Sequence, residues 1–573
     1  MRLSSLVFAG FGAAVALSGT VSAQDHVRPD YTREVLVAPM NGAAPGTGPH
    51  GLNGINFGSD GKLYGGSVTG PGIYKFDVVS ETVAEVIGAP AGEADDVAMA
   101  PAASPTPGAL VWTALLAGEL RARGTDGRIV TLARDLPMIN PVNFTDDGRL
   151  FVGQMGIPGL RPDALYEFDI LGRTAPRLIA KDMGNINAFV GDSAGGLYVP
   201  LAEKGAVGRI DIETGDITIL ADGLGQPVAV KRDSQGHLYA VDWVTGRITY
   251  INPDSGETFR IATVPPPVDN LALGPDDTIY VSRPSDNGII AVNRNDGSQR
   301  VVFNSGLAAP GLMTFAALGG APRLVASDAF GFRFIDPDTG AVTLLPFDLT
   351  TNASSAVAVN GATIALANVR RGTMTVIDRA ALERTNLGQS GGTAVPAKYL
   401  LSGFKAPMGI VLDDFGAILA VDYVTGELLH VAPGAASDRR VILDGLRGPV
   451  GLARGADGAL YVTETTSGAL TRIDVTTNTA VAVAMGRNQP EGLAALPDGR
   501  FAVAEAGARR LSIVNPETGT IQVIADELPI GQMFTRAPEP VYLPTGVAAD
   551  GDGVIYVACD RDNSVLKFSP NPN

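Results

Sequence analysis

The chain has 573 residues, of which 60 are Asp or Glu and 43 are Lys or Arg, so its net charge is −17 at pH 7. Nucleic acid is excluded as an expected partner, because a polyanion is bound through a surplus of cations. Apolar residues make up 45% of the chain and charged residues 18%, which is a globular composition, and the length exceeds what one compact core usually supports. We therefore expect at least two domains. The single cysteine, Cys559, excludes an intrachain disulfide framework and a cysteine-based zinc cluster.

Residues 1–23 have the pattern of an export signal. Arg2 precedes an apolar stretch over residues 3–17, and the Val-Ser-Ala of residues 21–23 has the small residues that a leader-peptidase site needs. Ser, Gly and Thr interrupt the stretch, which disfavours a membrane anchor, and no later segment is long and apolar enough to span a bilayer. We predict a mature chain that begins at Gln24, has no membrane span, and is exported to the periplasm or secreted.

The segment over residues 24–50 contains one predicted strand. Residues 32–38 read Thr-Arg-Glu-Val-Leu-Val-Ala and resemble the last strand of the repeats that follow, such as residues 440–443. The final repeat ends at Pro570 after only three strands. Because exposed strand edges are usually paired or covered, we predict that the two ends of the chain complete one sheet together. The ring that contains this sheet would then hold both chain ends, with the other ring inserted within it.

Residues 51–570 contain twelve copies of a repeat of about 43 residues. Each copy has a polar or Gly-Pro start, a short apolar strand, an Asp-Gly type turn, a second strand that often ends in an acid, and two more strands. Residues 451–464 and 546–560 are the clearest copies. One apolar position in the second strand marks all twelve copies: Leu63, Leu110, Leu150, Leu197, Leu238, Ile279, Leu324, Ile364, Ile418, Leu460, Phe501 and Ile555.

Each repeat has the composition of four short strands. Val, Ile and Thr alternate with polar residues, and the 71 glycines and 39 prolines favour tight turns, which disfavours a helical solenoid of similar period. Turns such as residues 210–215 and 335–340 would connect the third and fourth strands. Four strands per repeat predict β-propeller blades. The predicted fold is therefore all-β, with twelve four-stranded blades in two six-bladed rings over residues 51–307 and 308–573.

The start of the first strand in each blade is the expected place for a functional site, because these strands line the central channel and their starts meet at one mouth. Ten residues before the marker position, the first half of the chain carries Asn53, Asn140, Asn187, Val228 and Asp269, and the second repeat, which has a longer turn, carries Asp95-Asp96 at the corresponding place. The second half carries Thr314, Ser354, Met408, Val450, Glu491 and Thr545. The first half thus offers a ring of amide and carboxylate oxygens, and the second half offers fewer.

Amide and carboxylate oxygens are the ligands that Ca²⁺ prefers in proteins. We therefore predict a divalent cation, with Ca²⁺ as the expected ion, bound at the first mouth by Asn53, Asn140, Asn187 and Asp269. A purely structural role stays open, because Asn and Asp at strand starts also cap turns or hold channel waters without a metal. Among the four histidines, His50 lies three residues before Asn53 and is the one expected to reach this mouth as an acid or base.

The repeats resemble a known group of propellers. Residues 490–499, Pro-Glu-Gly-Leu-Ala-Ala-Leu-Pro-Asp-Gly, and residues 457–464, Asp-Gly-Ala-Leu-Tyr-Val-Thr-Glu, are similar to NHL-type propellers and to the gluconolactonase (senescence-marker-protein-like) superfamily. The resemblance covers essentially residues 51–570. It implies a calcium-dependent hydrolase of a small lactone or ester, whose metal is held by a Glu, two Asn and an Asp from different blades.

Three residues match that ligand set in type and order, namely Asn140, Asn187 and Asp269. The chain departs from the family pattern at two positions. Asn53 stands where the acid of the first blade is expected, and Val228 occupies the next blade after Asn187, so that Asp269 comes one repeat late. Glu491 resembles the missing acid, but it would reach the same channel only if the two rings interleave.

The resemblance also implies catalytic roles and leaves alternatives open. Asp269 or Asp95 would act as a base on water or as a nucleophile, at a small-molecule substrate. NHL propellers are often non-catalytic, so binding of a ligand or of a protein partner is a second reading. The repeats are also similar to those of virginiamycin B lyase, which makes a metal-assisted lyase a third.

Overall fold

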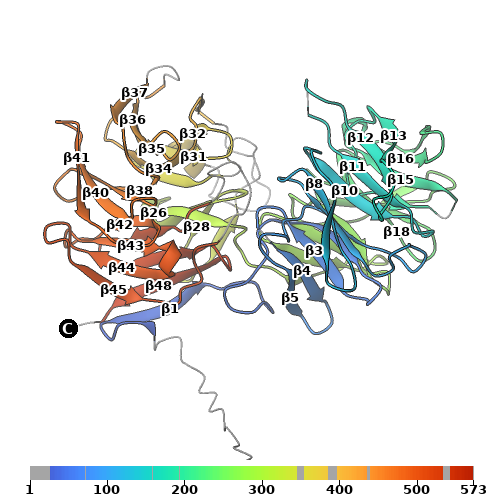
Figure 1. Ribbon diagram of the computed structural model, residues 1–573, viewed down its shortest axis with the longest axis horizontal. Helices are drawn as coiled ribbons and strands as arrows, with labels where there is room; N and C mark the ends of the chain where they lie inside the picture. Colours follow the sequence, from blue (N-terminus) through green and yellow to red (C-terminus); the bar gives the residue numbers. More distant parts are fainter. Residues whose placement is uncertain are drawn as a thin grey trace, which may run out of the picture.

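The computed structural model describes residues 26–571 apart from residues 71, 158, 193, 345–350, 352–353, 385–396, 435–438 and 533–542. The predicted export signal over residues 1–23 lies outside the described residues. The chain forms two lobes (Figure 1), built from twelve four-stranded antiparallel sheets. The predicted all-β fold with twelve blades is confirmed.

The first lobe is a ring of six sheets. Three of them are β2 (Leu52–Phe57), β3 (Leu63–Ser67), β4 (Ile73–Asp77) and β5 (Thr82–Ile87); β6 (Val97–Met99), β7 (Leu110–Ala114), β8 (Glu119–Arg123) and β9 (Ile129–Ala133); and β10 (Ile139–Phe144), β11 (Leu150–Gln154), β12 (Ala164–Phe168) and β13 (Arg177–Lys181). The other three are β14 (Val190–Gly191), β15 (Gly196–Leu201), β16 (Ala206–Asp211) and β17 (Ile217–Ala221); β18 (Pro227–Arg232), β19 (Leu238–Asp242), β20 (Arg247–Ile251) and β21 (Thr258–Thr263); and β22 (Leu271–Leu273), β23 (Ile279–Arg283), β24 (Gly288–Val292) and β25 (Gln299–Phe303). The first strands of neighbouring sheets contact one another, and β2 contacts β22, so this ring closes on itself.

The second lobe is also a ring of six sheets. Three of them are β26 (Pro310–Leu318), β27 (Ala321–Asp328), β28 (Gly331–Ile335) and β29 (Val342–Leu344); β30 (Ala356–Val359), β31 (Thr363–Asn368), β32 (Thr373–Asp378) and β33 (Tyr399–Ser402); and β34 (Pro407–Leu412), β35 (Ile418–Asp422), β36 (Glu427–Val431) and β37 (Arg439–Leu443). The rest are β38 (Pro449–Arg454), β39 (Leu460–Glu464), β40 (Ala469–Asp474) and β41 (Thr479–Ala484); β42 (Pro490–Ala495), β43 (Phe501–Glu505), β44 (Arg510–Val514) and β45 (Ile521–Ala525); and β46 (Val547–Ala549), β47 (Ile555–Cys559), β48 (Ser564–Pro570) and β1 (Tyr31–Val37). The one described α-helix, α1, is Arg379–Glu383, and short 3₁₀ helices span Ala202–Lys204 and Ala506–Ala508.

The last sheet of the second ring joins the two ends of the chain. Strand β1 runs antiparallel to β48, with Tyr31 opposite Pro570 and Val37 opposite Val565. In Figure 1, β1 (blue) lies beside β48 among the red strands of the second lobe. Contact between β26 and β46 then closes the ring. The first ring is therefore inserted between β1 and the rest of the second ring.

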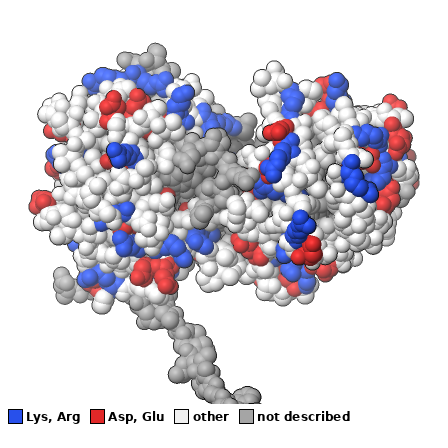
Figure 2. Space-filling view, in the orientation of Figure 1, with Lys and Arg blue, Asp and Glu red and all other residues white. Residues whose placement is uncertain are grey.

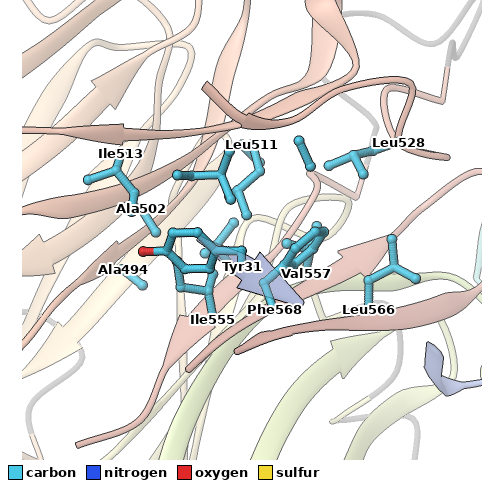
Figure 3. Close-up of a cluster of buried hydrophobic side chains, with 14 of the residues drawn as sticks. Tyr31, Ala494, Ala502, Leu511, Ile513, Leu528, Ile555, Val557, Leu566 and Phe568 are labelled. Carbon is cyan, nitrogen blue, oxygen red and sulfur yellow. The ribbon is translucent and has the colours of Figure 1, made fainter. Parts of the chain in front are cut away.

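Apolar side chains from neighbouring sheets form the core. One large cluster lies between the β42–β45 sheet and the closing sheet, and Figure 3 shows Tyr31 of β1 beside Ile555 and Phe568 in it. Phe568 is fully buried and Tyr31 is 8% exposed. The N-terminal strand thus contributes apolar burial as well as backbone pairing, and both stabilise the closed ring.

The rings touch through turns that lie at the mouth ends of their blades. In each sheet the start of the first strand lies beside the end of the second strand, so the turn after the second strand is at the same end as the channel mouth. Arg333 of the second ring donates from Nη2 to the carbonyl oxygen of Ser285, in the turn after β23, over 2.9 Å. The ring of His50 lies against Asp560, in the turn after β47. The contact is therefore made at the mouth ends of both rings.

Candidate functional site

Strand pairing identifies equivalent positions in the blades. Asn53 lies two residues before Ile55, which pairs with Gly65 of the second strand. By the same pairing, the equivalent first-ring residues are Asn53, Asp95, Asn140, Asn187, Val228 and Asp269. The structure thus brings the predicted residues of the first ring to one mouth.

Two of the predicted second-ring positions are wrong. Thr314 pairs with Val325 and lies further along β26, because the hairpin before β27 is short, and Gly311 takes the equivalent position. Ser355, whose backbone N–H donates to the carbonyl oxygen of Ala367, takes the place assigned to Ser354. A fixed count of ten residues fails where the first hairpin changes length. The second-ring set is Gly311, Ser355, Met408, Val450, Glu491 and Thr545.

A local irregularity frees two of the amide side chains. The pairing register shifts between Leu52 and Ile55 in β2, and between Ile139 and Val142 in β10. Bulges of this kind take residues out of the ladder and re-aim their side chains. The residues in these shifts include Asn53 and Asn140, whose amides then bond across blade boundaries instead of along their own strands.

Hydrogen bonds between neighbouring blades order the first-ring mouth. Asn53 donates from Nδ2 to Oδ1 of Asp95 over 2.8 Å. Asn140 donates from Nδ2 to Oδ1 of Asn187 over 3.0 Å. The amide oxygens of Asn53 and Asn140 are themselves buried, and they have no hydrogen-bond partner within the described part of the chain. These two oxygens are available to a ligand that accepts electron pairs, such as a metal cation.

The acids of this mouth hold their protons more tightly than usual. Burial raises the pKa of Asp95 to about 7, and the neighbouring charge of Asp96 adds to the shift. Burial also raises the pKa of Asp269, together with the charges of Asp95 and Asp96. Asp95 is 3% exposed, whereas Asp269 is partly exposed. Repulsion among these carboxylates would be relieved by a bound cation.

A second layer lies next to the mouth, and of its residues the sequence interpretation named Asp96 but not Asn270 or Lys231. Asp96 accepts hydrogen bonds from the backbone N–H of Val142 at 3.1 Å and from Nδ2 of Asn270 at 3.4 Å. Its carboxylate lies so close to Gly54 that a Cβ there would overlap it. Buried Lys231 offsets the burial of Asp96 through its positive charge. The sequence did contain a signal for this layer, because Lys231 lies inside the otherwise mostly apolar strand β18, Pro-Val-Ala-Val-Lys-Arg.

His50 does not join this mouth. It is 1% exposed, and its Nε2 lies 2.6 Å from the backbone oxygen of Asp560, which belongs to the second ring. Burial lowers the pKa of His50 to about 4, so the ring is neutral at physiological pH. We assign it to the contact between the rings, because its ring packs against the other lobe and away from solvent.

Glu491 belongs to the second ring and does not complete the first-ring set. Its Oε2 accepts a hydrogen bond from the backbone N–H of Thr545 over 2.7 Å. Burial and the charge of Asp560 raise the pKa of Glu491 to about 8. All six equivalent positions of the second ring are buried, whereas Asn53, Asn187 and Asp269 of the first ring are partly exposed. Ligands therefore have better access to the first mouth.

The donor set of the first mouth suits a hard cation. Among the described residues, no group of three or more His, Cys, Asp and Glu side chains is placed to share one metal ion. A cation here would therefore need the unpaired amide oxygens of Asn53 and Asn140 in addition to the carboxylates of Asp95 and Asp269. The amide oxygen of Asn187 already accepts hydrogen bonds from Nδ2 of Asn140 and from the backbone N–H of Ala188. Such an all-oxygen set, with unpaired amide oxygens already in place, fits Ca²⁺.

Comparisons with known proteins give structural neighbours only. No family model matches the chain, and no curated protein matches it. The GH74 xyloglucanase from Xanthomonas campestris is similar over 94% of this chain and 100% of its own, with 14% identity and a TM-score of 0.49. The extracellular domain of a putative one component system from B. thetaiotaomicron is similar over 94% of this chain and 84% of its own, with 12% identity and a TM-score of 0.33. None of the helices in the described ranges has the length and apolar character needed to cross a membrane.

Proposed function

We propose that this protein is an exported, cation-dependent hydrolase of a small lactone or ester, with its site at the mouth of the first ring. One observation carries the proposal. Five of the six equivalent positions hold Asn or Asp, and two of their amide oxygens are buried without a partner in the described structure. The second ring has the same architecture but buries all six of its equivalent positions.

The side chains of the first mouth would have different roles in cation binding and in proton transfer. Asn53, Asp95 and Asn140 would hold the cation together with Asp269, with Asn187 orienting the Asn140 amide, and the expected ion is Ca²⁺. When bound, this ion would supply a positive charge that polarises the carbonyl oxygen of the substrate. Asp269 is the partly exposed carboxylate, so it would take the proton from an attacking water onto a carboxylate oxygen. Its raised pKa makes Asp269 a stronger base than an ordinary carboxylate.

The first experiment measures metal content and metal-dependent stability. Elemental analysis of the purified mature protein is expected to find about one cation per chain. The melting temperature is expected to fall after EDTA and to recover when Ca²⁺ is added, because a ligand that binds only the folded state stabilises it. A screen of sugar lactones and simple esters with the Ca²⁺-loaded protein then tests hydrolysis directly.

Other outcomes point to other functions. A protein without metal and without an EDTA effect would contradict the proposal and favour a propeller that binds a ligand or a protein partner. A substrate that is cleaved without the mass of one added water would identify a lyase, since elimination does not consume water.

Export is proposed from residues 1–23 alone. Expression in a Gram-negative host, followed by fractionation and intact mass spectrometry, is expected to find a chain that begins at Gln24 in the periplasm or the medium. A full-length chain that stays in the cytoplasm would contradict export.

A further inference from the structure

The turn between β11 and β12 is the longest mouth-end turn of the first ring. It spans residues 155–163, whereas the corresponding turns of the other five blades have four or five residues. The described part of the turn folds back on itself, because Ile157 and Arg161 exchange two backbone hydrogen bonds, of 2.8 and 3.0 Å. Turns after the second strand of a blade lie at the mouth end, so the extra length adds Arg161 to this end of the ring.

Met155 connects this turn to the candidate site. Its backbone oxygen accepts a hydrogen bond from Nη2 of Arg161 over 2.7 Å. Its Sδ lies 4.0 Å from Nδ2 of Asn140, which belongs to the candidate site. The backbone N–H of Gly156 donates to Oδ1 of Asn185 over 3.3 Å and holds the start of the turn in place. A single residue, Met155, therefore separates the Arg161 guanidinium from the Asn140 amide.

The guanidinium of Arg161 has unused donors. Its Nε and Nη1 are screened from solvent and have no hydrogen-bond partner within the described part of the chain. Asp163, the nearest acid in sequence, is already engaged, because its two side-chain oxygens accept from the backbone N–H groups of Met183 over 2.8 Å and Ile186 over 3.0 Å. Most basic side chains on the visible face of the first lobe, in contrast, lie beside acidic ones (Figure 2). A cation that loses water without gaining a counter-charge is costly, which points to a partner from outside the chain.

The partner that Arg161 lacks is an anionic acceptor. A guanidinium has five N–H donors and no acceptor, and its strongest hydrogen bonds are made to ionised oxygens. The unpartnered atoms at this mouth are thus of two kinds, the amide oxygens of Asn53 and Asn140, which suit a cation, and the nitrogens of Arg161, which suit an anion. The Arg161 residue as a whole is partly exposed, so a ligand at the mouth has access to it.

We infer that Arg161 determines substrate specificity by binding a carboxylate of the substrate, which makes the substrate an acidic lactone or ester. This inference rests on the proposed function, because it places the carbonyl that is hydrolysed at the cation held by Asn53 and Asn140. The whole chain carries a charge of −17 and repels anions, so a neutral substrate would not require an uncompensated arginine beside its site, whereas an acidic one would.

The test compares the monolactone of an aldaric acid, which has a free carboxylate, with the primary amide of the same compound, which is neutral and of similar shape. Calorimetry with the full mature protein in Ca²⁺ gives Kd for each ligand, and steady-state assays give kcat and KM. Arg161→Gln is expected to weaken binding of the acid about 10- to 100-fold, the loss expected for a charge-assisted hydrogen bond, and to leave the amide unchanged. Arg161→Lys should retain part of the affinity.

Arg173→Gln is the matched control. Arg173 lies in the turn between β12 and β13, at the opposite end of the same blade, and its side chain is 69% exposed. Its removal takes the same charge from the blade and should leave the Kd of both ligands unaltered.

The stability of the ligand-free protein gives a second readout. Arg161→Met replaces the uncompensated cation by an apolar side chain, so the melting temperature should stay the same or rise. The acidic lactone should raise the melting temperature of the wild type but not of this variant. A lower melting temperature in the variant, with weaker binding of acid and amide alike, would show a structural role and overturn the inference.

The remaining outcomes separate this inference from the function on which it rests. Acid that binds Arg161→Gln as tightly as the wild type, or does not bind the wild type, overturns the role of Arg161. Hydrolysis of both lactones at wild-type rates by Arg161→Gln overturns that role but leaves the hydrolase intact. A fall in kcat for both lactones with unchanged Kd also overturns it, because Arg161 would then act on the reacting carbonyl. Binding of the acid that depends on Arg161, without hydrolysis of either lactone, contradicts the hydrolase and supports the carboxylate site.

Discussion

Asn53 donates a hydrogen bond from its side-chain amide to Oδ1 of Asp95 over 2.8 Å, across the boundary between two neighbouring blades of the first ring. The bond orients the buried Asp95 carboxylate and leaves the amide oxygen of Asn53 unpaired within the described structure. Neighbouring blades therefore present complementary ligand atoms to the channel mouth without the help of a long loop.

Removing a carboxylate from this mouth should weaken cation binding. Asp95→Asn and Asp269→Asn each replace a negative ligand by a neutral one of the same shape, and we expect Ca²⁺ affinity to fall about 10- to 100-fold. Calorimetric titration of the EDTA-treated protein measures the effect. Glu491→Gln makes the same kind of change at the equivalent position of the second ring and should leave the affinity unaltered. Equal affinities in all three variants would contradict the site.

Cation binding at this mouth should compete with protons. The pKa of Asp95 is raised to about 7 by burial, so this carboxyl is largely protonated at pH 6 and largely ionised at pH 8. Ca²⁺ affinity is therefore expected to rise with pH across this window, and binding should release protons. Titrations in two buffers of different ionisation enthalpy measure the released protons. Proton release that is unchanged in Asp95→Asn would speak against Asp95 as a ligand.

Stability of the second ring should fall as pH rises, because of Glu491. The folded-state pKa of Glu491 is about 8, above the ordinary value of 4.5 that applies to the unfolded chain. Between these values the folded state binds more protons, so the free energy of unfolding decreases with increasing pH. The raised pKa of Asp560, about 6, acts in the same direction. Glu491→Gln should flatten the dependence of the melting temperature on pH between 5 and 8, whereas Glu517→Gln, at an exposed position, should not.

Lys231 should stabilise the protein through Asp96. Both side chains are buried, and each opposes the desolvation of the other through its charge. Lys231→Met leaves the Asp96 charge without its counter-cation, and a loss of about 3–5 kcal/mol in the free energy of unfolding is expected. The double variant with Asp96→Asn should lose less than the sum of the single losses. Additive losses in urea unfolding would show that the two groups do not interact.

Tyr31 should stabilise the closing sheet. Its side chain lies in the apolar cluster between the last two sheets, and Tyr31→Ala is expected to cost about 3 kcal/mol. Val35, on the same strand, is 56% exposed, so Val35→Ala should change stability by no more than about 0.5 kcal/mol. Urea unfolding measures both variants. Equal effects would show that β1 contributes its backbone pairing alone.

The repeats predict the fold well because local turn chemistry and strand length fix each sheet. The strand predicted at residues 32–38 corresponds to β1, since its pattern matches the last strand of other repeats. Counting residues placed Thr314 at the channel mouth, which is wrong. The hairpin between β26 and β27 is shorter than in the other blades, and this change left the apolar pattern of the repeat unaltered. The contact of His50 with Asp560 and the Lys231–Asp96 pair could not be predicted, since both join residues far apart in sequence. They depend on how rings and blades pack.

Pairing of β1 with β48 also fixes the order in which the rings can close. Thr32 and its hydrogen-bond partner Asn571 are separated by 539 residues, so at a synthesis rate of about 5–20 residues per second the first strand waits roughly half a minute to two minutes for its neighbour. The first ring needs none of the strands beyond β25 and can close during that interval. The second ring therefore cannot finish before the last residues emerge, and its unpaired first strand is the segment most exposed to capture by another chain or by a chaperone.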